Sequence, residues 1–132
     1  MDRLLLDTCA VLWLANGDEL DREARARIAE GVLHVSPISA WEIGNLVRKG
    51  RIGLAMPTAS WFRQAIDRMQ AFTPSLSIEV LVESCQLPGN LAGDPADRII
   101  IATAREHELI VITRDEAILR YSGFGHVRAM KC

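Results

Sequence analysis

Leu4-Leu5-Leu6-Asp7-Thr8 is a short apolar run that ends on a carboxylate. Continuous apolar runs of this length, bounded by polar residues, are typical of strands buried in a parallel sheet. Three more strands are expected along the chain, at 33–35, 109–112 and 126–130. Longer segments separate the four runs, so a mainly parallel sheet with helices on both faces accounts for the order. We therefore expect an α/β fold.

The segments between the strands have helical periodicity and helix-end signals. Proline at position 57 suits a first helical turn, and Gly50 suits the residue just after a helix. The expected helices are 8–16, 21–30, 39–49, 57–72, 77–86, 95–107 and 115–121. No linker, repeat or low-complexity tract interrupts them, so residues 1–132 are expected to form one domain.

Composition places the chain among ordinary globular proteins. Apolar residues make up 49% of the 132 residues and charged residues 24%. Three cysteines without CxxC spacing argue against a disulfide framework or zinc knuckle and indicate the cytoplasm. The run from 4 to 15 contains Asp7 and is followed by no cleavage site, so it is interpreted as core rather than a signal peptide. No apolar stretch reaches the ~18 residues of a membrane helix.

Acidic residues occupy equivalent places along this pattern. Asp7 ends the first strand and Asp115 follows the strand 109–112, while Glu42 lies in the first turn of the helix after the strand 33–35. In an open α/β sheet the carboxyl ends of the strands form one edge, where ligand crevices open. Asp94 and Asp97 flank the start of the helix 95–107 and would reach that edge from a helix N-terminus.

Helix capping explains most of these acids without any functional role. Ser39-x-x-Glu42 and Thr113-x-x-Glu116 fit capping boxes, and Asp94-Pro95-Ala96-Asp97 fits an N-cap followed by proline and a first-turn acid. Asp7 is the exception, because Ala10 stands three residues later and offers no partner. Capping also gives no reason for all the acids to meet at one edge.

Converging carboxylates repel one another unless a cation lies between them. Hard oxygen ligands suit Mg²⁺ or Mn²⁺, and the three scattered histidines give no zinc-ligand spacing. The net charge of −2 is unusual for a nucleic-acid binder. However, five of the 17 acidic residues would belong to the metal site, which leaves 12 against 15 basic residues. The remaining surface is therefore mildly basic and compatible with RNA.

Four motifs follow one another along the chain: Leu4-Leu5-Leu6-Asp7-Thr8, Ser39-Ala40-Trp41-Glu42-Ile43, Gly93-Asp94-Pro95-Ala96-Asp97-Arg98-Ile99-Ile100-Ile101-Ala102 and Thr113-Arg114-Asp115. In this order and spacing they resemble the PIN domain, and within it the VapC-type toxins of bacterial toxin–antitoxin pairs. The resemblance covers about residues 3–130. It implies a three-layer α/β/α sandwich with Mg²⁺-dependent endoribonuclease activity. Relatives often have histidine where this chain has Cys9.

The resemblance also implies roles for individual residues. Catalytic and metal-binding roles fall on Asp7, Glu42, Asp97 and Asp115, with Asp94 as an accessory acid and Thr8, Ser39 and Thr113 as polar support. Metal-bound water would attack the RNA phosphodiester in line, without a side-chain nucleophile. The basic residues expected to contact RNA phosphates are Arg98, Arg114, Arg48, Lys49 and Arg51.

Two kinds of partner protein are implied as well. A small cognate antitoxin would restrain the toxin, and relatives form homodimers. The helix 8–16 is apolar nearly all round and the helix 39–49 is apolar on more than one side, so a groove between them is the expected antitoxin site.

Two alternative functions stay open at this point. A catalytically inactive PIN-like module would only bind a protein partner, although all four acids are present. A phosphatase or phosphotransfer domain also places aspartate at a strand end. A phosphatase of the haloacid dehalogenase type would need a second aspartate where Cys9 stands, and Lys131 lies too near the end of the chain for the lysine of a receiver domain.

Overall fold

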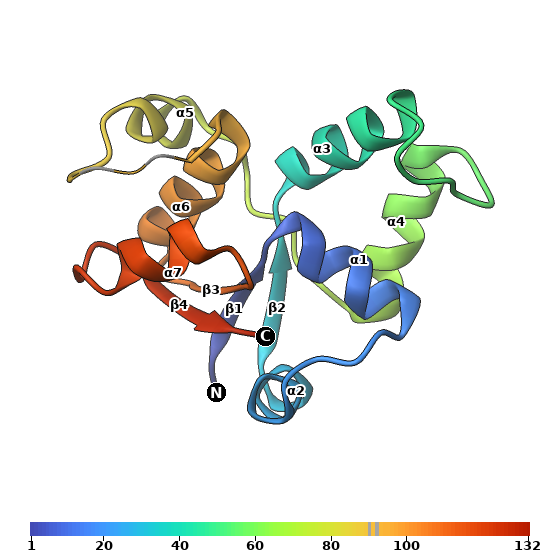
Figure 1. Cartoon of the computed structure of the whole chain (residues 1–132), viewed down its shortest axis with the longest axis horizontal. Coiled ribbons are helices and arrows are strands. Elements are labelled where there is room, and N and C mark those ends of the chain that lie inside the picture. The colour runs from blue at the N-terminus through green and yellow to red at the C-terminus, as the bar shows by residue number, and fades with distance from the viewer. Residues whose placement is uncertain (90, 92) are drawn as a thin grey trace.

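The computed structural model describes residues 1–89, 91 and 93–132 (Figure 1). Four strands alternate with seven helices over these residues. In chain order the elements are β1 (Arg3–Leu6), α1 (Thr8–Asn16), α2 (Arg22–Glu30), β2 (Val32–Val35), α3 (Pro37–Arg48), α4 (Thr58–Met69), α5 (Ile78–Cys85), α6 (Pro95–His107), β3 (Ile110–Thr113), α7 (Glu116–Ser122) and β4 (Arg128–Lys131).

All strand pairs in the sheet are parallel, and the strand order is β2-β1-β3-β4. The central strand β1 pairs Leu6 with Val35 of β2 on one side and with Ile112 of β3 on the other. The chain therefore leaves β1 toward β2 first and later crosses to the opposite side. This reversal lies between β1 and β3, where α/β sheets open a crevice at their carboxyl edge.

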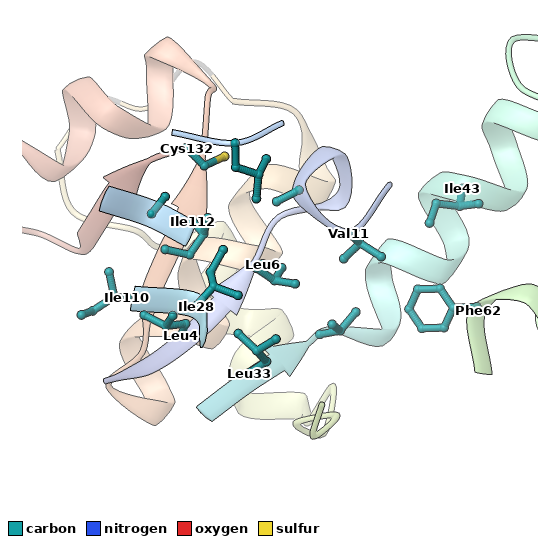
Figure 2. Close-up of a cluster of buried hydrophobic side chains, with 14 residues drawn as sticks. Leu4, Leu6, Val11, Ile28, Leu33, Ile43, Phe62, Ile110, Ile112 and Cys132 are labelled. Carbon is teal, nitrogen blue, oxygen red and sulfur yellow. The ribbon is translucent and has the colours of Figure 1, made fainter. Parts of the chain in front are cut away.

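Helices cover both faces of the sheet because successive side chains of a strand point in opposite directions. Leu4 and Leu6 of β1 pack on one face with residues of α1, α2, α3 and α4. Figure 2 shows this cluster, in which Val11, Ile43 and Phe62 extend the core away from the sheet. Leu5 faces the other way, into a second cluster with α5, α6 and α7. The expected three-layer α/β/α sandwich is confirmed.

The seven expected helices and four expected strands are all present, and most of them have shifted ends. The helix 8–16 has the expected bounds, and the helix 95–107 agrees as well. The helix expected over 39–49 begins earlier, at Pro37, because Ser36 is its N-cap and proline occupies its first turn. The helix expected over 57–72 ends at Met69, since Gln70 adopts a left-handed conformation with φ 53°. Among the described residues no helix is long and apolar enough to cross a membrane.

Candidate active site

The parallel sheet brings the predicted acids to its carboxyl edge. Asp7 follows β1 and Asp115 follows β3, and these two strands are hydrogen-bonded neighbours. Glu42 lies on α3, the helix that follows β2 on the other side of β1. Asp97 lies in the first turn of α6, whose N-terminus reaches the same edge. The four acids come from four separate parts of the chain.

A cavity of about 230 Å³ opens between these elements. Its lining residues are Asp7, Thr8, Cys9, Trp13, Glu42, Asp97, Arg114 and Asp115. All four acids predicted as catalytic therefore line one cavity. Asp94 is not among the lining residues and is exposed at the start of α6. The sequence reasoning identified the acids, but it did not place Cys9 or Trp13 in the site.

Asp7 is held by hydrogen bonds on both of its carboxylate oxygens. Oδ1 accepts from the backbone amide of Ala10 at 2.8 Å, and Oδ2 accepts from the Thr113 hydroxyl at 2.5 Å. The expectation that Asp7 has no capping role was wrong, because the partner is the backbone of Ala10 and not its side chain. Asp7 is only 7% exposed, and burial raises its carboxyl pKa despite these two bonds, which act in the opposite direction.

Glu42 is positioned by Thr8 rather than by a capping box. The Thr8 hydroxyl donates a hydrogen bond to Oε1 of Glu42, and it also lies 3.0 Å from Oγ of Ser39. The expected bond from Glu42 to the Ser39 amide was wrong, because that amide donates to the Ser36 carbonyl. Burial is the main cause that raises the carboxyl pKa of Glu42, and the charges of Asp94 and Asp7 act in the same direction.

Asp94 and Asp97 form the cap expected from the sequence. Oδ1 of Asp94 accepts a hydrogen bond from the Asp97 amide at 2.8 Å. This bond orients the first turn of α6 and leaves the Asp97 side chain facing the cavity. Burial, followed by the charges of Asp94, Asp115, Glu42 and Asp7, raises the pKa of Asp97 to about 7. Burial and the repulsion between the carboxylates therefore both favour the protonated form of Asp97.

Asp115, and not Thr113, is the N-cap of α7. Oδ1 of Asp115 accepts from the amides of Ala117 and Ile118 at 2.8 and 3.1 Å. The capping box expected from Thr113 to Glu116 was wrong, because Thr113 ends β3 and its hydroxyl is directed to Asp7. The same hydroxyl oxygen accepts from the Asp115 amide at 2.9 Å. Thr113 therefore connects two of the four acids.

Cys9 is exposed and lies at the mouth of the acidic cavity. Burial of the sulfur, together with the charges of the four acids, raises the thiol pKa to about 11. At neutral pH the thiol is consequently protonated, and a thiol is a far weaker nucleophile than a thiolate. Cys9 therefore lacks the low thiol pKa of an activated nucleophile.

The donor set of the cavity fits a hard divalent cation. The four carboxylates supply only oxygen ligands. Burial first, and the charges of neighbouring carboxylates second, raise the pKa values of Asp7, Glu42 and Asp97, and a cation between the carboxylates would relieve both effects. Within the described residues, no three His, Cys, Asp or Glu side chains already form a metal-binding group. Mg²⁺ in proteins is commonly held by one or two carboxylates and keeps several waters, so it does not require such a cage.

Of the five basic residues expected to contact RNA, only Arg114 lines the cavity. The Arg98 guanidinium donates to the carbonyls of Ser84 and Leu91, at 2.8 and 3.1 Å, and so joins α6 to α5 and the segment after it. Arg48, Lys49 and Arg51 are exposed around the end of α3 and are not lining residues of the cavity. The interpretation of these three as phosphate contacts stays a prediction.

The parallel sheet, the helices on both of its faces and the four carboxylates at its carboxyl edge define an α/β/α domain with an acidic site. Residues 4–123 match the sequence model of the family described as "PIN domain". The chain belongs to the PIN-domain family, and the resemblance noted from its motifs is confirmed.

Relatives of known identity and solved structures agree with this assignment. The chain is 35% identical over 120 residues to Ribonuclease VapC22 of Mycobacterium tuberculosis, and the match covers 89% of this chain and 91% of that protein. The fold resembles chains in the DNA-bound structures of VapBC2 from Rickettsia felis (TM-score 0.69, 14% identity, 97% of each chain) and of VapBC from Salmonella typhimurium (TM-score 0.66, 16% identity, 99% and 98%). A toxin–antitoxin complex from Klebsiella pneumoniae aligns with TM-score 0.62 and 24% identity over 87% of this chain and 89% of that one.

Proposed function

We propose that this protein is a divalent metal-dependent endoribonuclease that hydrolyses RNA phosphodiester bonds, with Mg²⁺ as the metal and Mn²⁺ as a substitute. The observation that carries the proposal is the convergence of Asp7, Glu42, Asp97 and Asp115 on one cavity. The 35% identity to a protein named as a ribonuclease supports the choice of RNA as substrate.

The four acids would hold the metal, and Asp94 would assist by fixing the first turn of α6. When bound, the metal lowers the pKa of a water molecule and neutralises negative charge on the phosphate. Thr113 and Thr8 keep the carboxylates of Asp7 and Glu42 in place, so that the site is ordered before RNA arrives. The Ser39 hydroxyl lies 3.0 Å from the Thr8 hydroxyl and helps to hold it in place.

The products of the reaction test this mechanism. Attack by water with departure of the 3′-oxygen leaves a 3′-hydroxyl and a 5′-phosphate. We expect the purified protein to cut single-stranded RNA only with Mg²⁺ or Mn²⁺ and to leave these two ends. A 2′,3′-cyclic phosphate would overturn the proposal, because it forms by attack of the RNA's own 2′-hydroxyl. Cleavage of equal rate in excess chelator would overturn it as well.

We propose further that the protein acts in the cytoplasm as the toxin of a toxin–antitoxin pair and is restrained by a small antitoxin. An apolar cavity of about 340 Å³ supports a groove for such a partner. Its lining residues are Leu14, Ala15, Leu33, Trp61, Gln64, Ala65, Arg68 and Met69. This cavity lies between α1 and α4 and not, as expected from the sequence, between α1 and α3. An amphipathic segment would place its apolar side chains there.

A homodimer is the third part of the proposal. Trp41 on α3 is 60% exposed, and Ile78, Leu81 and Val82 of α5 are 77%, 41% and 49% exposed. Trp41 also lines a shallow apolar cavity with Leu76 and Ile99. Both α3 and α5 pack against α6, and apolar side chains exposed in this number are typical of a protein interface. The face formed by α3 and α5 is the one on which we place the second copy.

A further inference from the structure

An arginine and a tryptophan are stacked at the mouth of the acidic cavity. The Arg114 guanidinium carbon lies 4.0 Å from the centre of the Trp13 ring. Trp13 comes from α1 and Arg114 from the connection between β3 and α7, and both line the cavity with the four acids. A guanidinium over an indole face is a favourable cation–π arrangement.

Two backbone carbonyls hold the same guanidinium. Nη2 of Arg114 donates to the carbonyl of Glu19 at 2.9 Å and to that of Cys132 at 3.2 Å. Arginine carries five N–H hydrogens in a planar fork. No hydrogen bond within the described residues uses Nε or Nη1 of Arg114, so three of these hydrogens remain for a ligand.

The position of Arg114 is unusual for a cation beside four carboxylates. An unrestrained guanidinium would form an ion pair with one of the acids, and Asp115 is its immediate neighbour in the chain. Within the described residues, ion pairs form only between Arg27 and Asp2 and between Arg105 and Glu83. The stack on Trp13 and the bonds to the two carbonyls therefore keep Arg114 at the mouth of the cavity, where it forms no ion pair with any of the four acids.

We infer that Trp13 is a positioning residue for RNA binding, which holds the Arg114 guanidinium where it takes a phosphate next to the bond that is cut. Guanidinium groups donate charge-assisted hydrogen bonds to phosphate oxygens, and the hydrogens on Nε and Nη1 of Arg114 are left for such bonds. The inference rests on the proposed ribonuclease function, and it assigns Trp13 a role that neither the acids nor the family motifs supply.

Binding of single-stranded RNA in rising salt tests the inference. In an Asp97→Asn background, which removes cleavage under the proposed function, fluorescence anisotropy gives the affinity for a short oligoribonucleotide between about 50 and 200 mM salt with Mg²⁺ present. Each phosphate contact contributes about 0.7 to the slope of log K against log salt for single strands. We expect Arg114→Gln to reduce the slope by about 0.7. Arg25→Gln, which removes an exposed arginine on α2, is the matched control and should leave it unchanged.

Trp13 is tested with two variants, because its ring also packs against the core. Trp13→Leu keeps an apolar side chain but removes the aromatic face, and it should reduce the slope as Arg114→Gln does. Trp13→Phe keeps an aromatic face and should restore most of the slope. Because Trp13 acts through Arg114, the double variant Trp13→Leu/Arg114→Gln should bind RNA no more weakly than Arg114→Gln alone.

Three results would overturn the inference. Unchanged slopes in Arg114→Gln and Trp13→Leu would show that the pair contacts no phosphate and only joins α1 to the chain segments around Glu19 and Cys132. Additive losses in the double variant would show that Trp13 contacts RNA independently. A wild-type protein that binds no RNA would refute this inference together with the proposed function. If RNA binding depends on salt through Arg114 but the wild-type protein does not cleave RNA, the proposed function alone would be refuted.

Discussion

The hydroxyl of Thr113 donates a hydrogen bond to Oδ2 of Asp7, a residue 106 positions earlier in the chain. The bond joins the carboxyl ends of β3 and β1, which are neighbours in the sheet. Because the same hydroxyl accepts from the amide of Asp115, one threonine fixes two acids of the cavity relative to each other. The geometry of the proposed metal site therefore depends on a side chain that does not itself face the cavity.

Replacement of this threonine should affect activity more than the fold. In Thr113→Val, Oδ2 of Asp7 loses its donor and the Asp115 amide loses its acceptor, which costs about 1–3 kcal/mol of unfolding free energy. RNA cleavage should fall by roughly 10- to 100-fold, as is typical for residues that orient metal ligands. Thr103→Val is the matched control, since Thr103 is also fully buried but bonds only the Ile99 carbonyl within α6. Equal cleavage rates in the two variants would refute the role given to Thr113.

Divalent ions should stabilise the folded protein. An ion that binds the carboxylates only in the folded state adds about 2.7 kcal/mol of unfolding free energy at 100 times its Kd. We expect Tm to rise with Mg²⁺ or Mn²⁺ but not with K⁺ at matched ionic strength. Asp97→Asn should raise Tm without metal, because repulsion is relieved, and should weaken the response to the ions. A Tm that millimolar Mg²⁺ and Mn²⁺ leave unchanged would contradict the metal site.

The metal-free protein should lose stability as the pH rises toward neutrality. The pKa of Asp97 is about 7 in the folded protein against 3.8 for an ordinary aspartate, so between these values the folded state binds more protons than the unfolded state. The contribution of Asp97 to the unfolding free energy therefore decreases with pH across this window and levels off above about pH 7. Asp7 and Glu42 act in the same direction, since their pKa values are also raised. His34 acts in the opposite direction, because burial lowers its pKa.

Urea unfolding between pH 4 and 8 measures this dependence. The Asp97→Asn curve should be flatter than that of the wild type, because one of the groups that take up a proton on folding is gone. Asp2, whose pKa is lowered by its hydrogen bond to Arg27, titrates below the window and does not disturb the comparison. Identical curves for the two proteins would show that Asp97 does not carry the raised pKa.

Different substitutions should weaken the binding of the antitoxin and the formation of the homodimer. We expect the protein to co-purify with the product of a neighbouring gene and to form a homodimer. Leu14→Ser, in the cavity between α1 and α4, should weaken the first interaction. Ile78→Asp, on the exposed face of α5, should weaken the second and so serves as the control. A monomer that captures no such product, in a cell that tolerates its overexpression, would contradict both partners.

The fold could be predicted because its signals are local. The apolar run 4–6 and the carboxylate that follows it mark a strand end without any tertiary information. Helix ends are harder to predict, because more than one serine can fit the N-cap position of the same helix. Ser39-x-x-Glu42 fits a capping box, but the helix begins earlier, with Ser36 as its N-cap and Pro37 in its first turn.

The acids of the site could be predicted from their positions, but their hydrogen-bond partners could not. The bonds from Thr113 to Asp7 and from Thr8 to Glu42 join segments far apart in sequence, and no spacing rule encodes such bonds. The stack of Arg114 on Trp13 could not be predicted for the same reason, because it depends on how α1 lies against the end of β3. Only the folded chain brings these pairs together.

Cleavage of one defined RNA by wild type and Asp97→Asn, at saturating Mg²⁺, tests the central claim most directly. Asp67→Asn, an exposed change on α4, is the matched control. We expect Asp97→Asn to lower the rate by at least roughly a hundredfold. This loss exceeds the one usual for residues that only orient a metal ligand. Asp94→Asn should be milder, because asparagine also caps a helix. Equal rates for Asp97→Asn and Asp67→Asn, with matched circular dichroism spectra, would contradict the acidic cavity as the active site.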